Sequence, residues 1–222
     1  MSGKVIVSDA GIVCLVGGAR LDPAEICRIS SFVSSYIGVD GGADHLLDAG
    51  ITPAAVIGDL DSLSEHARAT FAEQLCHISE QSTTDFEKAL TRVSAQAVIA
   101  LGFTGGRIDH ALNVLNVMAR YPAKKVLLAD AEDVSFLAGQ GRTVLRLPMA
   151  TRLSLMPLDA ARVSVTGVEW PFADQDMTPA GFISPSNAVA ADEVLIDVAG
   201  PLLITLPRAH LAVALKAVVP AG

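Results

Sequence analysis

Acidic residues and small hydroxyl residues gather in two short segments of the chain, 58–62 and 83–85. Asp59 and Asp61 stand two positions apart, directly after an apolar run that predicts a buried strand, and Asp85 belongs to the second segment. Open α/β sheets carry their sites at the carboxyl ends of strands, and carboxylate oxygens are ligands that Mg²⁺ prefers. These residues therefore predict a magnesium site, and the alternative interpretation is a turn followed by a helix cap.

The composition is that of a globular protein with one or two domains. The chain has 222 residues, of which 51% are hydrophobic and 18% charged, and its formal net charge is −8. This charge, without a cluster of Lys and Arg, argues against binding to nucleic acid or to an anionic membrane. Cys14, Cys27 and Cys76 form no CxxC pair and are expected to be reduced thiols. No signal peptide is recognisable and no apolar run approaches the roughly 20 residues that span a bilayer, so we expect a soluble, cytoplasmic protein.

The apolar pattern changes near residue 140. Before it, continuous apolar runs alternate with helix signals, and the predicted strands are 12–16, 37–39, 54–57, 97–101 and 126–129. This alternation predicts an α/β domain, residues 1–140, whose mainly parallel sheet has helices on both faces. After residue 140 short runs alternate with a period of two, and the predicted strands are 143–147, 152–156, 162–165, 193–198 and 202–206. They predict an antiparallel β-sandwich, or a small barrel, over residues 141–222.

Helix starts are signalled by small polar residues. Asp22, Ser62 and Thr84 are each followed by a glutamate at the spacing of a capping box, so we expect a helix to begin after each. Another helix is expected over residues 108–120. Its apolar positions share one helical face: Ile108, Leu112, Leu115 and Ala119.

Glycines and acidic residues follow the predicted strands of the first half. These segments are 17–18, 40–42, 58–59 and 102–107. In a parallel sheet they would lie along one edge, where glycine N–H groups can approach a phosphate closely. Arg107 would sit near the first turn of a helix, able to pair with a phosphate oxygen. The pattern predicts a phosphate-binding edge, although neither a P-loop nor a dinucleotide fingerprint is present.

Asp109 follows Arg107 in the same predicted turn and is a further functional candidate. Asn113 and Asn116 share its helical face, and an ordinary solvated face explains the two asparagines equally well. The five histidines show no metal-ligand spacing, so the sequence does not predict a zinc site.

Taken in order, these motifs resemble those of the thiamine pyrophosphokinase family. The matching segments are 40–42, 58–62, 84–90, 105–110, 167–171 and 183–187. The resemblance covers nearly the whole chain, and several motifs in the same order are more specific than any one of them.

The resemblance implies a homodimer that transfers the pyrophosphoryl group of ATP to the hydroxyl of thiamine, giving thiamine diphosphate and AMP. It implies that residues 1–140 form the catalytic domain, which binds ATP and Mg²⁺, and that residues 141–222 form the domain for thiamine binding and dimerisation. It implies that Asp59, Asp61 and Asp85 hold Mg²⁺, with Asp40 close by. Asp109 would act with Arg107 at the nucleotide phosphates or the reacting centre. The residues implied to bind the nucleotide are Asp40, Gly41, Gly42, Gln81, Thr84, Lys88, Gly105, Gly106 and Arg107. Those implied to hold thiamine, at a cleft between subunits, are Trp170, Ser184, Ser186 and Asn187.

This sequence departs from the family pattern at two positions. Glu80 stands where the family usually has Asp, and Ala188 stands where bacterial relatives often have Glu. Trp170 has an alternative interpretation as a core residue of the second domain. Two alternative functions stay open: a pyrophosphokinase acting on another hydroxymethyl heterocycle such as a pterin, and a non-catalytic protein that binds nucleotide or thiamine.

Overall fold

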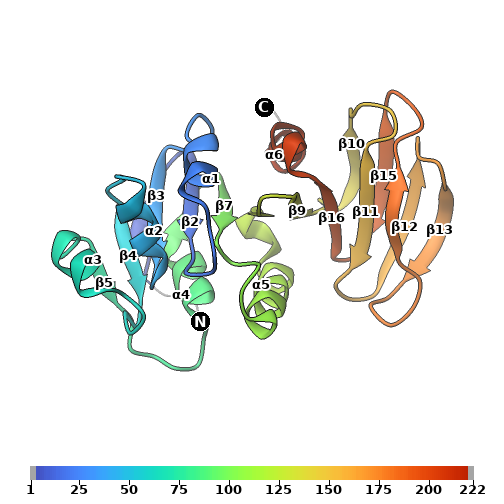
Figure 1. Ribbon diagram of the computed structural model, residues 1–222. Coiled ribbons are helices and arrows are strands. Elements are labelled where there is room, and N and C mark those ends of the chain that lie inside the picture. Colours follow the sequence, from blue (N-terminus) through green and yellow to red (C-terminus); the bar gives the residue numbers. More distant parts are fainter. Residues whose placement is uncertain (1–3, 220–222) are drawn as a thin grey trace. The chain divides into compact units, whose positions relative to one another are not determined.

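The apolar runs of the first half form a parallel sheet (Figure 1). The structure is a computed structural model that describes residues 4–219. In sheet order the strands are β7 (Ala97–Leu101), β2 (Ile12–Val16), β3 (Ser35–Val39), β4 (Ala55–Gly58) and β5 (Leu75–His77). All four pairings between them are parallel. Every residue of β4 and β7 is buried, as expected for strands covered on both faces. The predicted α/β architecture of this half is confirmed.

Helices connect these strands and cover the sheet. They are α1 (Pro23–Arg28), α2 (Gly42–Asp48), α3 (Glu65–Thr70), α4 (Asp85–Arg92) and α5 (Ile108–Arg120). The predicted start of α1 is confirmed, because the Asp22 side chain accepts a hydrogen bond from the Ala24 N–H. The predicted cap at Ser62 is wrong, because α3 begins after Ser64, whose hydroxyl accepts from the Ala67 N–H. The Ser62 N–H instead donates to Asp40, and this tertiary contact keeps Ser62 in the preceding loop.

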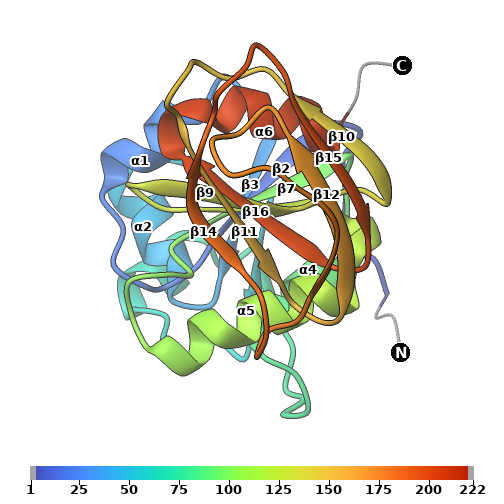
Figure 2. The same ribbon diagram turned by 90° about the vertical axis from the view of Figure 1, so that its right-hand side faces the viewer.

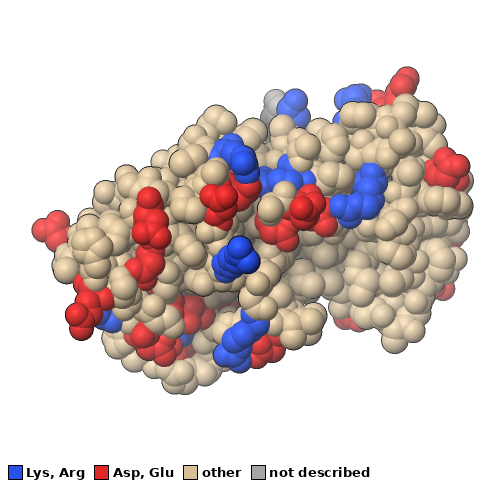
Figure 3. Space-filling view, viewed as in Figure 1, with Lys and Arg blue, Asp and Glu red and all other residues tan. Residues whose placement is uncertain are grey.

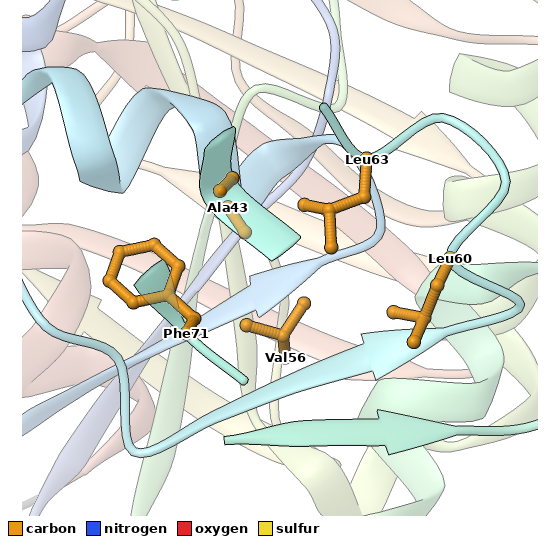
Figure 4. Close-up of a cluster of buried hydrophobic side chains, with 6 residues drawn as sticks. Ala43, Val56, Leu60, Leu63 and Phe71 are labelled. Carbon is orange, nitrogen blue, oxygen red and sulfur yellow. The ribbon is translucent and has the colours of Figure 1, made fainter. Parts of the chain in front are cut away.

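A hydrophobic cluster anchors the loop that follows β4 (Figure 4). Leu60 and Leu63 point from this loop toward Val56 of β4, Ala43 of α2 and Phe71 after α3. Burial of an aliphatic side chain contributes about 1.5–3 kcal/mol. The loop is therefore held by apolar contacts through Leu60 and Leu63, whereas Asp59, Asp61 and Ser62 of the same loop line a cavity.

Of the described residues, 4–117 and 128–130 form the first compact unit, and 118–127 and 131–219 form the second. Around this division lie the short 3₁₀-helix η1 (Pro122–Lys124) and β8 (Val126–Ala129). The expected domain boundary at residue 140 stays a prediction.

The second unit contains two antiparallel arrays of strands (Figures 1 and 2). One has the order β10 (Gly141–Leu145), β15 (Val194–Ala199), β12 (Ala161–Thr166) and β13 (Phe172–Met177). The other has the order β14 (Ser184–Ala188), β11 (Arg152–Pro157), β16 (Leu202–Pro207) and β9 (Asp133–Leu137). Buried and more exposed residues alternate along β11, β12 and β15, so each array has one apolar face, as in a sandwich. The antiparallel fold predicted for this half is confirmed.

The remaining elements are short. Strand β1 (Val7–Ser8) pairs with β6 (Val93–Ser94) in the first unit, and η2 (Arg208–His210) leads into α6 (Leu211–Val218) in the second. Within residues 4–219, no helix is long and apolar enough to cross a membrane.

Candidate active site

Three carboxylates from two neighbouring strand ends lie together in the first unit. Asp40 directly follows β3, and Asp59 and Asp61 follow β4. One carboxylate oxygen from each lies within 4.8 Å of the other two. The parallel pairing of β3 with β4 produces this arrangement, since it brings both carboxyl ends to one edge. Oxygens at this spacing can share one hard divalent cation.

Asp59 carries an unsatisfied oxygen. Its Oδ2 accepts a hydrogen bond from Lys88 Nζ at 3.2 Å, whereas its buried Oδ1 has no hydrogen-bond partner in the described structure. Leaving a buried polar atom unpaired is costly, and such atoms are rare in folded proteins. An unpaired carboxylate oxygen beside two further carboxylates fits a divalent cation.

Asp85 stands next to this group, at the first position of α4. Its Oδ1 accepts from the Asp59 N–H at 3.2 Å and from Lys88 Nζ at 2.9 Å. The group of three carboxylates thus contains Asp40, with Asp85 linked to it by hydrogen bonds. The assignment of Asp85 as a metal ligand stays a prediction.

Lys88 is almost completely buried, with 1% of its side chain exposed, and it forms ion pairs with both Asp59 and Asp85. Burial lowers the pKa of Lys88, but hydrogen bonds and charge from the two carboxylates outweigh burial and raise it above its usual value. Burial likewise raises the pKa of Asp59, and Lys88 reverses the effect, so that this pKa is lowered. The pKa of Asp40 is raised, mainly by burial, against hydrogen bonds from Ser62 and Gly41. Lys88 is therefore a fixed positive charge beneath the carboxylates.

The backbone is unusual on both sides of the site. Asp40 has a φ of 47° and Leu60 a φ of 65°, both in the left-handed region that residues other than glycine rarely adopt. Such conformations persist only where surrounding contacts enforce them. For Leu60 the contacts are those of the hydrophobic cluster, and its turn leaves the flanking Asp59 and Asp61 on the polar side.

Gly58 separates two of these carboxylates. A Cβ at this position would lie 3.0 Å from the Cβ of Asp40 and 3.2 Å from Oδ1 of Asp85. We expect Gly58→Ala to reduce turnover roughly tenfold to a hundredfold, because small displacements of reacting groups misalign a catalytic site. Steady-state kinetics checks this, with Gly139→Ala as the matched control, since a Cβ on Gly139 meets nothing within 4 Å. Equal turnover in the two variants would contradict the prediction.

A cavity of about 840 Å³ opens at this edge of the sheet. Loops after β2, β3, β4 and β7 line it, together with the starts of α4 and α5. The predicted site residues in its wall are Asp40, Gly41, Asp59, Asp61, Gln81, Thr84, Asp85, Lys88, Gly105, Gly106 and Arg107. Its cations are Arg20, Lys88 and Arg107. On the face seen in Figure 3, acidic and basic side chains are interspersed.

Two predicted nucleotide-site residues are not part of the cavity wall. Gly42 lies against the main chain of β2, where a Cβ would meet the Val16 carbonyl oxygen at 1.9 Å, so close packing requires a glycine here. Its part in binding nucleotide stays a prediction. Asp109 is exposed and pairs with Arg107 at the start of α5, with 2.6 Å between Asp109 Oδ2 and Arg107 Nη2. This exposed pair lies at the cavity's rim, because Arg107 itself belongs to the wall.

Two glycines that line the cavity, Gly17 and Gly102, contact each other through their backbones. A Cβ on Gly17 would lie 2.6 Å from the Gly102 carbonyl oxygen, and a Cβ on Gly102 would lie 2.4 Å from that of Gly17. Gly102 also has a φ of 72°. Only residues without a side chain allow the loops after β2 and β7 to approach this closely.

Several cavity residues were not predicted from the sequence. His45 Nε2 lies 2.9 Å from the Ala19 carbonyl oxygen and so ties α2 to the loop after β2. Thr84 Oγ1 donates to Asn113 Oδ1 at 2.7 Å, which joins the start of α4 to α5. Asn113 therefore lines the cavity, whereas Asn116, one turn further on, does not. Helical periodicity placed Asn113 on the correct face but could not reveal its partner.

The four residues implied to bind thiamine belong to the second unit. Trp170 is 62% exposed, so its alternative interpretation as a core residue is wrong. Asn187 is buried and donates from Nδ2 to the Trp170 carbonyl oxygen and to Ser184 Oγ. Ser186 is exposed, and its N–H donates to Ser154 Oγ. The structure thus brings Trp170, Ser184 and Asn187 together.

Comparison with known proteins agrees with this architecture. The family model described as "Thiamin pyrophosphokinase, catalytic domain" matches residues 28–128, and "Thiamin pyrophosphokinase, vitamin B1 binding domain" matches residues 142–203. Thiamine pyrophosphokinase 3 of Oryza sativa subsp. japonica is 26% identical over 85% of this chain and 83% of its own. Thiamine pyrophosphokinase of Bacillus subtilis (strain 168) is 28% identical over 77% of this chain and 86% of its own.

Solved structures share the fold. Thiamin pyrophosphokinase from Geobacillus thermodenitrificans superposes with a TM-score of 0.74 at 22% identity, covering 88% of this chain and 96% of that one. The enzyme from Candida albicans gives a TM-score of 0.76 at 14% identity, covering 92% of each chain. With both family models matched in order along the sequence, we conclude that the chain belongs to the thiamine pyrophosphokinase family.

Proposed function

We propose that this protein transfers the pyrophosphoryl group of ATP to the hydroxyl of thiamine, giving thiamine diphosphate and AMP. The observation that carries the proposal is the group formed by Asp40, Asp59 and Asp61, with its unpaired buried oxygen, in the wall of a glycine-lined cavity. Membership of the family supports the choice of substrates.

The cavity suits a polyphosphate. Attack by an alcohol on phosphorus needs in-line positioning and neutralisation of the phosphate charges. The backbone at Gly18, Gly41 and Gly106 leaves room for phosphate oxygens at the strand ends. Arg107, exposed at the rim, can pair with a phosphate oxygen in place of Asp109.

Asp40, Asp59 and Asp61 would hold Mg²⁺, with Asp85 beside them. When bound, Mg²⁺ would supply charge neutralisation and orientation of the phosphate oxygens. Lys88 has a separate task, because its ammonium group fixes the positions of Asp59 and Asp85 through hydrogen bonds at 3.2 and 2.9 Å.

Trp170 is the proposed thiamine contact in the second unit. Its exposed indole can stack on a flat heteroaromatic cation, the chemical character of the thiazolium ring of thiamine. The exposed carboxylate of the adjacent Glu169 also suits a cationic ligand.

Direct detection of the nucleotide product tests this function. The protein is incubated with ATP, Mg²⁺ and thiamine, and the nucleotides are then separated. AMP is expected with thiamine and not with a hydroxymethyl pterin. AMP formed only with the pterin would favour the other pyrophosphokinase, binding of thiamine without turnover would favour the non-catalytic alternative, and ADP as product would contradict the assignment.

We also propose that the protein is a cytoplasmic homodimer. Within residues 4–219, Cys14, Cys27 and Cys76 form no disulfide, which suits a reducing compartment. On α5, Ile108 is 76% exposed and Leu112 is 61% exposed, one helical turn apart. An apolar pair this exposed suits a subunit interface.

Leu112→Glu should convert a dimer into a monomer, because a charge at the centre of an apolar contact must be desolvated without a partner. Light scattering coupled to gel filtration measures the mass, and activity should fall with it. Val5→Glu is the control, since Val5 is also an exposed apolar residue but lies outside α5. A monomeric wild type, or a dimeric Leu112→Glu variant, would refute this interface.

A further inference from the structure

Asn187 uses the whole hydrogen-bonding capacity of its side chain within the protein. Its Oδ1 accepts from the Trp170 N–H at 3.2 Å and from the Ala188 N–H at 2.9 Å. Its Nδ2 donates to the Trp170 carbonyl oxygen at 3.0 Å and to Ser184 Oγ at 3.3 Å. A carboxamide offers two acceptor sites and two donor hydrogens, and all four are occupied here. With 1% of its surface exposed, the Asn187 side chain has no hydrogen-bonding group left for a ligand and is not accessible to one.

The main chain around Trp170 explains why this side chain is needed. Residues 167–169 run antiparallel to residues 188–190, with a bridge between Val168 and Val189. The Glu169 N–H donates to the Ala188 carbonyl oxygen at 2.8 Å, and the Ala190 N–H donates to the Gly167 carbonyl oxygen at 2.9 Å. At Trp170 the Asn187 side chain bonds both the N–H and the carbonyl oxygen of the main chain. The backbone beneath the indole is therefore clamped, while the indole itself projects into solvent.

We propose that Asn187 is a positioning residue that acts through Trp170, holding its main chain so that the exposed indole is already oriented to stack on the heteroaromatic cation of the substrate. This inference rests on the proposed function, and it replaces the direct contact between Asn187 and thiamine that the family resemblance implied. Fixing an aromatic anchor before binding lowers the conformational entropy that binding must overcome. Asn187 therefore sets the affinity for thiamine and not the rate of phosphoryl transfer.

The test uses Asn187→Ala and Asn187→Asp in the full-length protein. The aspartate keeps the two acceptor positions but cannot donate to the Trp170 carbonyl oxygen. For Asn187→Ala we expect the KM for thiamine to rise about tenfold, a typical consequence of losing an anchoring pair of hydrogen bonds. The kcat and the KM for ATP should stay within about twofold of wild type, since they depend on the other unit. The KM for thiamine of Asn187→Asp should lie between that of wild type and that of Asn187→Ala.

A second readout does not need a ligand. Trp170 is the only tryptophan of the chain, so the decay of tryptophan fluorescence anisotropy reports on this ring alone. The wild-type indole should move with the protein, and a fast component should appear in Asn187→Ala and, more weakly, in Asn187→Asp. Gln175→Ala is the matched control, because this carboxamide on β13 donates to the Asp176 carbonyl oxygen and, among residues 4–219, forms no hydrogen bond with Trp170.

The results distinguish a failure of the positioning role of Asn187 from a failure of the proposed function. Wild-type anisotropy in a folded Asn187→Asp variant, with an unchanged KM for thiamine, would overturn the positioning role. If kcat fell and the KM values for ATP and for thiamine rose together, Asn187 would have only a structural role. If wild type forms no AMP with thiamine, the proposed function fails. The anisotropy measurement still decides whether Asn187 holds Trp170.

Discussion

Replacing Asp61 by asparagine should reduce AMP formation by about a hundredfold to a thousandfold, the loss seen when one group that stabilises developing charge is removed. Asp61 is exposed, and its side chain accepts a hydrogen bond from the neighbouring Ser62 hydroxyl, so the fold should survive its replacement. The asparagine keeps the shape of the side chain and removes its charge from the group of three carboxylates. Initial rates measured over a range of Mg²⁺ concentrations check the prediction.

Asp48→Asn is the control for this variant. Asp48 is an exposed carboxylate at the end of α2 and is not part of the cavity wall, so its replacement should leave AMP formation unchanged. If Asp61→Asn proved as active as Asp48→Asn at every Mg²⁺ concentration, Asp61 would have no part in the reaction.

Lys88→Met should destabilise the protein by about 3–5 kcal/mol in the absence of Mg²⁺, the usual effect of removing one partner from a buried ion pair. Methionine fills the volume of the lysine stem but leaves Asp59 and Asp85 without the ammonium group that bonds both. A divalent cation should restore part of the loss, because it neutralises the same carboxylates. Urea unfolding with and without Mg²⁺ measures both effects.

The pH dependence of stability provides a further check on Lys88. The pKa of Asp59 is lowered in the folded protein from an ordinary value of 3.8: burial raises it, and the two largest opposing effects are the hydrogen bond and the charge of Lys88, followed by hydrogen bonds from Asp61 and Gln81. Asp59 therefore contributes stability above pH 3.8, and this contribution is lost as the pH falls through the lowered pKa. The loss of stability should be smaller in Lys88→Met than in the control Lys216→Met, whose lysine is exposed on α6. If Lys88→Met left the loss of stability at low pH unchanged, the role given to the ion pairs would be contradicted.

Local patterns were sufficient to predict the core elements of the first unit. Strands 12–16, 97–101 and 126–129 and the helix over residues 108–120 occur with the predicted bounds. The strands are short runs buried on both faces, so they do not depend on a distant partner for their definition. The helix has the predicted bounds but not the predicted buried face, because Ile108 and Leu112 are exposed whereas Val114, Val117 and Met118 are buried. The choice between Ser62 and Ser64 as a cap did depend on such a partner, since the bond from Ser62 to Asp40 decides it.

The second unit was predicted less completely. Strand β13 has the sequence Phe-Ala-Asp-Gln-Asp-Met and lies at an edge, pairing only with β12 in the described structure. Strand β14 contains a proline and pairs irregularly with β11. Neither strand has the alternating apolar residues that identify a half-buried strand, because edge strands bury less of their surface.

For the site, the sequence indicated the correct edge of the sheet but not the arrangement within it. Parallel strand ends had to converge, so the segments that carry Asp40 and Asp59 could be grouped without a structure. The inward direction of Lys88, the unpaired oxygen of Asp59 and the saturation of Asn187 arise from contacts between residues distant in the sequence. No local pattern encodes these contacts.

Because the backbones of Gly17 and Gly102 are in contact, neither position can accept a residue with a side chain. Any other amino acid at either position would push apart two loops whose strands are adjacent in the sheet. We therefore expect inherited changes in ligand preference to arise at other lining residues, such as Arg20 and Asn113. We expect related proteins that bind different ligands to keep this pair of glycines and to differ at other residues that line the cavity.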